Sequence, residues 1–414
     1  MSLEKLNEAL VAEVGTLEGE GRAKAPERVI VAYLPAEGTR GPRYRLAGSE
    51  RSFIRMNSNS YLSLSNHPAL IAAADEATHA FGVGPGAVRF IDGTFRHHVE
   101  LERRIAAFVD RPAAKIFNSA YTANLGQALA IAGPRTFWIG DELNHNSIIR
   151  AMRISGVPKE NRSIYDHNDM DELSRLLEEV PDRMDRVVVI FDGIFSMRGD
   201  FAPVDEINRR LAPHRGRFPQ GLVTVIDDSH GIAAYGPTGR GTEEHTGAHA
   251  DLFIGTFGKA FGVNGGFVAS SREVIEGIRQ KSDTYIYTNP LSVADCAAAH
   301  AALDLTDSPE GRSRLAHLHE RIRQFRAGLD RLGLESIPGP HAVVPLLVRD
   351  TARTRALVRH FFDHGVLVVG LTYPVVPRGD DTIRFQINAA HTETDIAEVL
   401  AILESFPGPE VPTA

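Results

Sequence analysis

Short apolar runs alternate with helical stretches through the middle of the chain. The runs cover residues 115–117, 135–139, 187–191, 222–226 and 252–254. Continuous apolar runs separated by helices are typical of parallel strands that are buried on both faces. The pattern therefore predicts an α/β fold with a mostly parallel central sheet and helices on both of its faces. We expect this large domain to span residues 56–295.

Two segments with other patterns flank this region. Residues 1–55 are expected to form an N-terminal arm, with a polar helix over 3–17, an irregular segment that contains proline and glycine, and a short apolar run before Asn57. Residues 296–414 are expected to form a small α+β domain. Its predicted elements are helices over 313–332 and near 352–364, apolar runs at 342–348, 366–369 and 382–387, and a last helix that Thr392 caps.

The composition is typical of a globular protein and reduces the classes of partner that the protein could bind. The 414 residues are 43% hydrophobic and carry a formal net charge of -8, with acidic and basic residues interspersed. This argues against nucleic acid or an anionic membrane as the main partner. A single cysteine excludes an internal disulfide, and no apolar run approaches the ~20 residues that cross a bilayer. The first residues lack a secretory signal pattern, so we expect a cytoplasmic protein.

Polar residues directly follow three of the apolar runs, at 192–196, 227–230 and 255–259. Because the carboxyl ends of parallel strands meet at one edge of a sheet, these side chains are expected to converge. Any one such segment could be an ordinary strand-end cap. Three of them together with a lysine favour a functional site.

Lys259 and Asp227 are the pair that pyridoxal phosphate chemistry requires. Lys259 is flanked by small residues and can form a Schiff base with a bound aldehyde, while Asp227, at the end of a buried strand, can keep a pyridine nitrogen protonated. His230 could then approach the phenolate oxygen of the cofactor. The sequence therefore predicts pyridoxal 5'-phosphate as the cofactor, with these three residues as catalytic candidates.

Further candidates lie at other strand ends. Ser119, Ala120 and Tyr121 stand between a strand and a helix, where free backbone amides could bind the cofactor phosphate, and Thr256 is a second phosphate contact. His145 could stack on the pyridine ring and joins the catalytic candidates. Alone, the first group would be only a helix cap, and His145 would be a surface or core histidine.

The sequence gives no support for a dinucleotide-binding, phosphate-loop or metal-binding motif. The glycine pattern at 82–87 has dinucleotide-binding spacing but follows a helical stretch instead of a strand. The chain has no phosphate-loop signature, no HExxH and no clustered cysteines for zinc. Asp227, Asp228 and His230 are residue types that bind metals, but the nearby lysine would be an unusual companion, and we expect no metal.

Ordered motifs along nearly the whole chain resemble the α-oxoamine synthases. These are fold-type I pyridoxal phosphate enzymes that condense an amino acid with an acyl-CoA and release carbon dioxide. The similar segments, in order, are 59–62, 88–94, 98–102, 141–148, 193–200, 227–231, 239–241, 255–259 and 265–266. The resemblance implies a homodimer with active sites at the subunit interface.

The resemblance also implies roles for individual residues. Lys259 corresponds to the Schiff-base lysine, Asp227 to the partner of the pyridine nitrogen and His145 to the stacking ring. His230 and Ser196 correspond to groups near the phenolate oxygen.

The remaining implied contacts concern the phosphate and the substrate. Ala120, Tyr121 and Thr256 correspond to phosphate contacts, and Thr288 to one donated by the neighbouring subunit. Arg384 corresponds to the arginine that binds the substrate carboxylate, and Asn59 to a substrate contact.

Within the family, segments 88–94 and 368–377 are most similar to the glycine C-acyltransferase branch, whose reaction joins glycine and acetyl-CoA. Segment 256–268 also resembles the serine palmitoyltransferase branch. Ser63 stands where the family usually has glycine, Arg198 replaces an aspartate, and 289–292 differs from the usual Ser-Leu-Pro-Pro. These departures leave the acyl donor open between a CoA and a carrier-protein thioester.

The implied reaction is a decarboxylative condensation of a small amino acid with an acyl thioester, which gives an α-amino ketone, carbon dioxide and a free thiol. Glycine, alanine and serine stay open as the amino acid. An aminotransferase or decarboxylase of the same fold is an alternative, and a requirement for a thioester separates the two. A non-catalytic assembly protein that keeps the fold is a third reading, against which the intact Lys259, Asp227, His230 and Arg384 argue.

Overall fold

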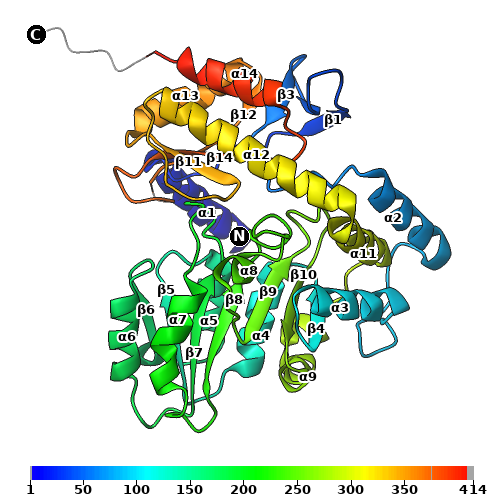
Figure 1. Ribbon diagram of the computed structural model, residues 1–414. Coiled ribbons are helices and arrows are strands. Elements are labelled where there is room, and N and C mark those ends of the chain that lie inside the picture. Colours follow the sequence, from blue (N-terminus) through cyan, green and yellow to red (C-terminus); the bar gives the residue numbers. More distant parts are fainter. Residues whose placement is uncertain (1, 374, 408–414) are drawn as a thin grey trace, which may run out of the picture.

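A computed structural model describes residues 2–373 and 375–407 (Figure 1). Its centre is a seven-stranded sheet in the order β4-β10-β9-β8-β7-β5-β6, in which β10 runs antiparallel to both of its neighbours and the other pairs are parallel. The mostly parallel sheet is therefore confirmed. Its strands are β4 (Ala113–Phe117), β5 (Thr136–Asp141), β6 (Arg162–Tyr165), β7 (Arg186–Asp192), β8 (Leu222–Asp227), β9 (Leu252–Thr256) and β10 (Gly266–Ser270).

Helices cover both faces of this sheet because both faces are apolar. On β7, Val187 and Val189 belong to one buried cluster, while Val188 and Ile190 belong to another on the opposite face. The first cluster includes residues of α3 (Arg96–Phe108), α6 (Met170–Glu179) and α7 (Val204–Leu211). The second includes residues of α4 (Ala120–Ile131), α5 (Asn146–Ile154) and α9 (Arg272–Lys281).

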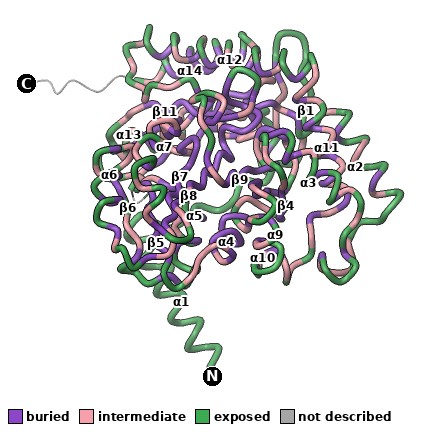
Figure 2. The backbone as a smooth tube through the Cα atoms, turned by 60° about the horizontal axis from the view of Figure 1, so that its bottom comes forward, coloured by how far each residue is buried: buried purple, intermediate pink, exposed green. Residues whose placement is uncertain are grey.

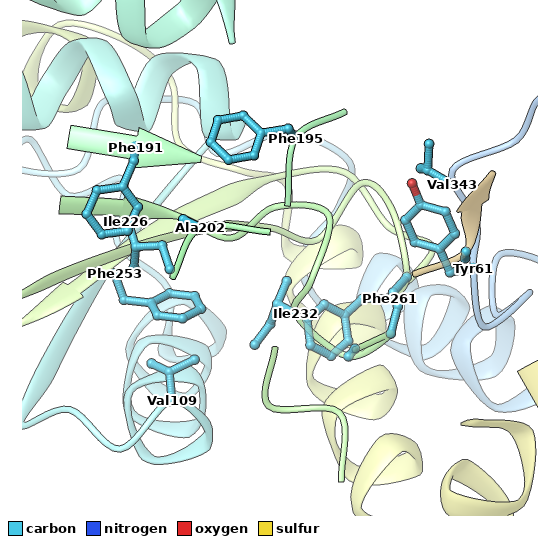
Figure 3. Packing of buried hydrophobic residues seen from close by; sticks show 14 of the residues in the cluster. Tyr61, Val109, Phe191, Phe195, Ala202, Ile226, Ile232, Phe253, Phe261 and Val343 are labelled. Carbon is cyan, nitrogen blue, oxygen red and sulfur yellow. The ribbon is translucent and has the colours of Figure 1, made fainter. Parts of the chain in front are cut away.

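The larger cluster continues beyond the sheet. Figure 3 shows Phe191, Ile226 and Phe253, from three neighbouring strands, packed together in it, and the same cluster contains Tyr61 and Val343. The other helices of the region are α2 (Pro68–Phe81), α8 (Thr242–Thr246), α10 (Asp283–Ile286), α11 (Val293–Asp307) and the short 3-10 turns Lys159–Asn161 and Ala212–His214.

The N-terminal segment differs from its prediction after the first helix. Helix α1 (Ser2–Gly19) buries no residue and projects from the body in Figure 2. The stretch expected to be irregular instead carries β1 (Ile30–Leu34) and β2 (Arg43–Leu46), and the short apolar run before Asn57 forms β3 (Ser52–Arg55). β3 pairs in parallel with β12 (Val366–Leu367), so the two ends of the chain share one sheet. None of these short strands has the long apolar run that marks a buried strand.

The C-terminal region has the α+β composition that its pattern predicts. Helix α12 (Pro309–Arg331) leads to an antiparallel sheet in the order β11-β14-β13. The elements are β11 (Val343–Leu347), α13 (Thr351–Asp363), β13 (Val369–Leu371), β14 (Thr382–Gln386) and α14 (Glu393–Glu404). The domain boundaries at 55 and 295 stay predictions; α11 runs across the second of them and packs on α2 and α3.

Among the described residues, no helix combines the length and apolar character that a membrane span needs.

Asp395 ties the two ends of the chain together. Its carboxylate accepts hydrogen bonds from the backbone N–H of Thr392, which caps α14, and from that of Gly41, and it forms a 2.7 Å ion pair with Arg43. The Asp395 side chain is completely buried. A buried carboxylate with this many donors is costly to disturb, because each donor would lose its acceptor.

We predict that Asp395→Ala lowers the free energy of unfolding by about 3–5 kcal/mol, since it leaves Arg43 without its buried partner. Glu398→Ala is the control, because Glu398 contacts the same Arg43 at 3.4 Å but its side chain is 41% exposed, and about 0–1 kcal/mol is expected there. Urea denaturation followed by circular dichroism measures both. Equal effects of the two substitutions would contradict this assignment.

Candidate active site

β7, β8 and β9 bring their last residues to one edge of the central sheet. Asp192 pairs in register with Asp227, and Asp227 with Ile254. Lys259 follows β9 in a turn that Gly262 closes by donating its N–H to the Lys259 carbonyl at 3.0 Å. Lys259 interacts electrostatically with both carboxylates, so the three strand ends converge as the sequence predicts.

The carboxylate of Asp227 is fixed by two donors. Asn124 Nδ2 donates to Oδ2 at 2.6 Å, and the N–H of Ser229 donates to Oδ1 at 3.1 Å. Asn124 Nδ2 also lies 3.0 Å from Ser147 Oγ, which in turn lies 2.8 Å from Nδ1 of His145. Asn124 was not predicted from the sequence, yet it joins Asp227 to the His145 cap of α5.

His145 itself lies at the N-terminus of α5 with its ring exposed. Its backbone N–H donates to Asp192 Oδ2 at 2.6 Å, which holds the start of the helix against the end of β7. The ring interacts electrostatically with Asp227 and Lys259. An exposed ring beside these two residues is free to stack on a flat ligand.

The protonation of Lys259 is set mainly by burial. Burial disfavours the charged amine and lowers the pKa of Lys259 to about 8, against the opposing effect of the Asp227 and Asp192 carboxylates. Part of the lysine is therefore a neutral amine near pH 7. A neutral amine is the form that attacks an aldehyde or accepts a proton.

The predicted phosphate contacts surround the start of α4. Ser119 caps this helix, with its Oγ accepting from the N–H of Thr122 at 3.1 Å. The N–H groups of Ala120 and Tyr121 are at the first positions of the helix and have no acceptor within it. A Cβ added at Gly266 would lie 2.2 Å from the nitrogen of Ala120, so β10 can pass here only as glycine. Such a helix end favours an anion.

Thr256, the other predicted phosphate contact, ends β9 beside this helix start. Its hydroxyl donates to the carbonyl of Gly265 at 2.9 Å and accepts from the N–H of Gly258 at 3.0 Å. Gly265 also bridges to Ser119. Gly265 therefore joins Thr256 to the start of α4. Thr256 lies in the sequence between Asp227 and Lys259.

Arg384 and Ser196 come together from opposite parts of the chain. Nη1 of Arg384 donates to the Ser196 carbonyl at 2.9 Å, while its buried Nε has no partner among the described residues. Asn59 accepts a hydrogen bond from the Gln386 amide, two positions after Arg384 on β14. The structure thus places Arg384 beside the loop that follows β7, and Asn59 beside the same strand, β14, that carries Arg384.

Thr288 lies between α10 and α11, with its hydroxyl 3.5 Å from Nδ2 of Asn118 in the same chain. Its contact with a neighbouring subunit stays a prediction.

Asp228 has a structural task instead of a chemical one. Its carboxylate accepts from the N–H and the hydroxyl of Thr242, both at 2.7 Å. A Cβ added at Gly193, Gly231 or Gly241 would lie 2.2 Å or less from this carboxylate. Burial raises its pKa to about 8. Within the described part of the chain, no group of three or more histidine, cysteine or acidic side chains is arranged to hold a metal ion.

Ser63, one of the departures from the family pattern, has a φ of 54°. This is the left-handed region that favours glycine, so the serine carries backbone strain at a position where the family usually has none. Its hydroxyl accepts from the N–H of Ala390 at 3.1 Å, which partly offsets that strain.

The chain is similar to known proteins over most of its length. Residues 51–403 match the family model described as aminotransferase class I and II. The 8-amino-7-oxononanoate synthase of Thermoanaerobacter pseudethanolicus is 36% identical over 89% of this chain and 90% of its own length. That of Geobacter sulfurreducens is 37% identical over 94% and 97%. The chain belongs to the α-oxoamine synthase family.

A solved structure adds to this family assignment. Serine palmitoyltransferase from S. paucimobilis, with bound PLP-myriocin, superposes with a TM-score of 0.82 at 26% identity, over 96% of both chains. These matches give no support to the glycine C-acyltransferase branch of the α-oxoamine synthases over the other two branches, so that sequence-based assignment is not retained.

We predict that the rate at which a small aldehyde plus reductant labels Lys259 in the cofactor-free protein rises about tenfold per pH unit up to about pH 8 and then levels off. An unshifted lysine would continue to rise toward 10.5. Because Asp227 raises the pKa of Lys259, Asp227→Asn should move the inflection to lower pH. Peptide mass spectrometry measures the labelling. An inflection above pH 10 would contradict the role of burial.

Proposed function

We propose that this chain is a pyridoxal phosphate enzyme that condenses a small amino acid with an acyl thioester and releases carbon dioxide and a free thiol. The observation that carries the proposal is the meeting of Lys259 and the anchored Asp227 at one sheet edge, with Arg384 brought beside the neighbouring loop. The names of the relatives and of the solved neighbour support the same class of reaction.

The residues at the sheet edge fit this cofactor. The first turn of α4 with Thr256 suits a phosphate, and the fixed Asp227 carboxylate suits a protonated ring nitrogen. Lys259 suits an aldehyde, and the exposed His145 ring suits a stacked aromatic ring. When bound, pyridoxal phosphate supplies an electron sink for the charge that develops at the α-carbon.

The chain's own groups then handle protons and orientation. The neutral amine of Lys259 takes the α-proton of the amino acid. Arg384 pairs with the substrate carboxylate and keeps the α-carbon in reach of Lys259. The bonds from Asn124 and Ser229 fix the position of the Asp227 carboxylate, which would accept a hydrogen bond from the protonated ring nitrogen of the bound cofactor.

The bond changes follow from the products. The α-carbon loses its proton and forms a bond to the carbonyl carbon of the thioester, and the carbon–sulfur bond breaks. The thiolate leaves and takes up a proton. The bond between the α-carbon and the carboxylate then breaks to release carbon dioxide, and a proton returned to the α-carbon gives the α-amino ketone.

The finer identity of the substrates belongs to this proposal too. We expect glycine, alanine or serine as the amino acid, and a CoA or carrier-protein thioester as the acyl donor. We also propose a homodimer in which Thr288 reaches the site of its partner, as the similarity to the α-oxoamine synthases implies.

The test is amino-acid-dependent thiol release from a panel of acyl-CoAs and acyl carrier proteins, with chains from acetyl to palmitoyl. We expect release with one donor class, and a loss of at least about 100-fold in kcat for Lys259→Ala, because that variant lacks the amine that takes the α-proton. Lys281→Ala is the control, because Lys281 donates to the Ala130 carbonyl, away from the strand ends. Amino-group transfer to an oxo acid without any thiol release would instead indicate an aminotransferase.

We predict that Arg384→Ala raises KM for the amino acid about 10- to 100-fold, corresponding to ~1.5–3 kcal/mol for hydrogen bonds to a charged group. The KM for the thioester should change much less, because Arg384 is assigned to the carboxylate of the amino acid. Steady-state kinetics with each substrate varied in turn measures both constants. Arg349→Ala, which removes an exposed ion pair with Glu335, is the matched control. An unchanged amino acid KM in the Arg384 variant would refute the assignment.

A further inference from the structure

His230 is held from two sides by buried side chains. The Tyr61 hydroxyl oxygen lies 2.7 Å from Nδ1 of its ring, and Nε2 of His341 lies 3.0 Å from its backbone carbonyl oxygen. Tyr61 and His341 also touch each other, with ring centroids 5.2 Å apart. Nothing in the sequence pattern marks either residue as a partner of His230.

The protons of His341 follow from its two hydrogen bonds. The backbone N–H of Val343 lies 3.1 Å from Nδ1 and can only donate, so this nitrogen is the acceptor. Nε2 therefore carries the proton and donates it to the carbonyl of His230. Burial lowers the pKa of His341 to about 3, which keeps the ring neutral.

The proton of Tyr61 has two possible acceptors. His230 Nδ1 lies at 2.7 Å, and Asn59 Oδ1 lies at 3.3 Å and already accepts from Gln386. The shorter bond to an unoccupied acceptor is the stronger one. Burial raises the pKa of Tyr61, so its hydroxyl keeps the proton that it donates.

The ring of His230 is neutral for a related reason. Burial is the main cause of its strongly lowered pKa, and the basic groups that face it, Lys259, His341, Arg384 and His145, act in the same direction. A neutral ring that accepts at Nδ1 must carry its proton on Nε2. No described residue accepts a hydrogen bond from Nε2.

We propose that Tyr61 is a positioning residue that fixes His230 in the Nε2–H tautomer, so that His230 presents an N–H donor, and not a base, to an anionic oxygen of the bound cofactor or substrate. His341 supports the same geometry from the backbone side. The catalytic consequence rests on the proposed function, whereas the tautomer itself is a property of the protein alone.

The test is long-range 1H–15N NMR of the cofactor-free protein labelled at histidine, with the His230 signals assigned by their loss in His230→Gln. We expect a protonated Nε2 and an unprotonated Nδ1 at neutral pH. In Tyr61→Phe the donor is gone, and the two nitrogens should move toward the averaged shifts of a tautomer mixture. Tyr235→Phe is the matched control, because this buried tyrosine packs against His341 but its hydroxyl bonds to no described residue.

A protonated Nδ1 in the unmodified protein would overturn the proposal, since the Tyr61 hydroxyl would then donate to Asn59. Unchanged His230 signals in Tyr61→Phe would overturn it as well. In the loaded enzyme, Tyr61→Phe should lower kcat about tenfold with the amino acid KM within about twofold, and it should shift the visible absorbance of the bound cofactor. A fixed tautomer without any thioester reaction would reject the proposed function and leave the assignment of Tyr61 intact.

Discussion

The carboxylate of Asp227 is held at the end of β8 by two hydrogen bonds that come from different parts of the chain. Its oxygens are out of water, and a buried charge is tolerated only where donors replace the lost solvent. Asn124 is one of those donors and lies one helical turn after Ala120, so the same bond that holds Asp227 also sets α4 above the strand end. The hydrogen bond between Asn124 and Asp227 therefore fixes the start of α4 relative to the Asp227 carboxylate.

Loss of water governs the protonation of the groups around this acid. Burial is the first cause of the lowered pKa values of Lys259, His230 and His341 alike, and it makes all three less charged than they would be in solution. His230 and His341 are therefore neutral rings with defined proton positions near pH 7, and Lys259 is neutral in part. Neutral rings of this kind can orient a reacting molecule without a buried counterion.

The central sheet could be predicted from the sequence because its strands are apolar on both faces. Strands with one face in water instead alternate apolar and polar residues. β1, β2 and β3 could not be predicted as strands, since each has only four or five residues, and β3 finds its parallel partner strand only in the C-terminal region. At the site, the residues that follow strands were recognisable by position and chemistry. Asn124, Tyr61 and His341 were not, because each acts through a partner that is distant in sequence.

The bond between Gly41 and Asp395 joins positions 354 residues apart. During synthesis, β1, β2 and β3 leave the ribosome long before β12 and α14 are made. The edge of β3 that pairs with β12 therefore stays unpaired until nearly the whole chain has been synthesised. Contacts of such high sequence separation form late and leave unpaired strand edges exposed in the meantime. The C-terminal region thus completes the sheet that the N-terminal region begins. Refolding yields should fall at high protein concentration, where unpaired strand edges can pair between molecules.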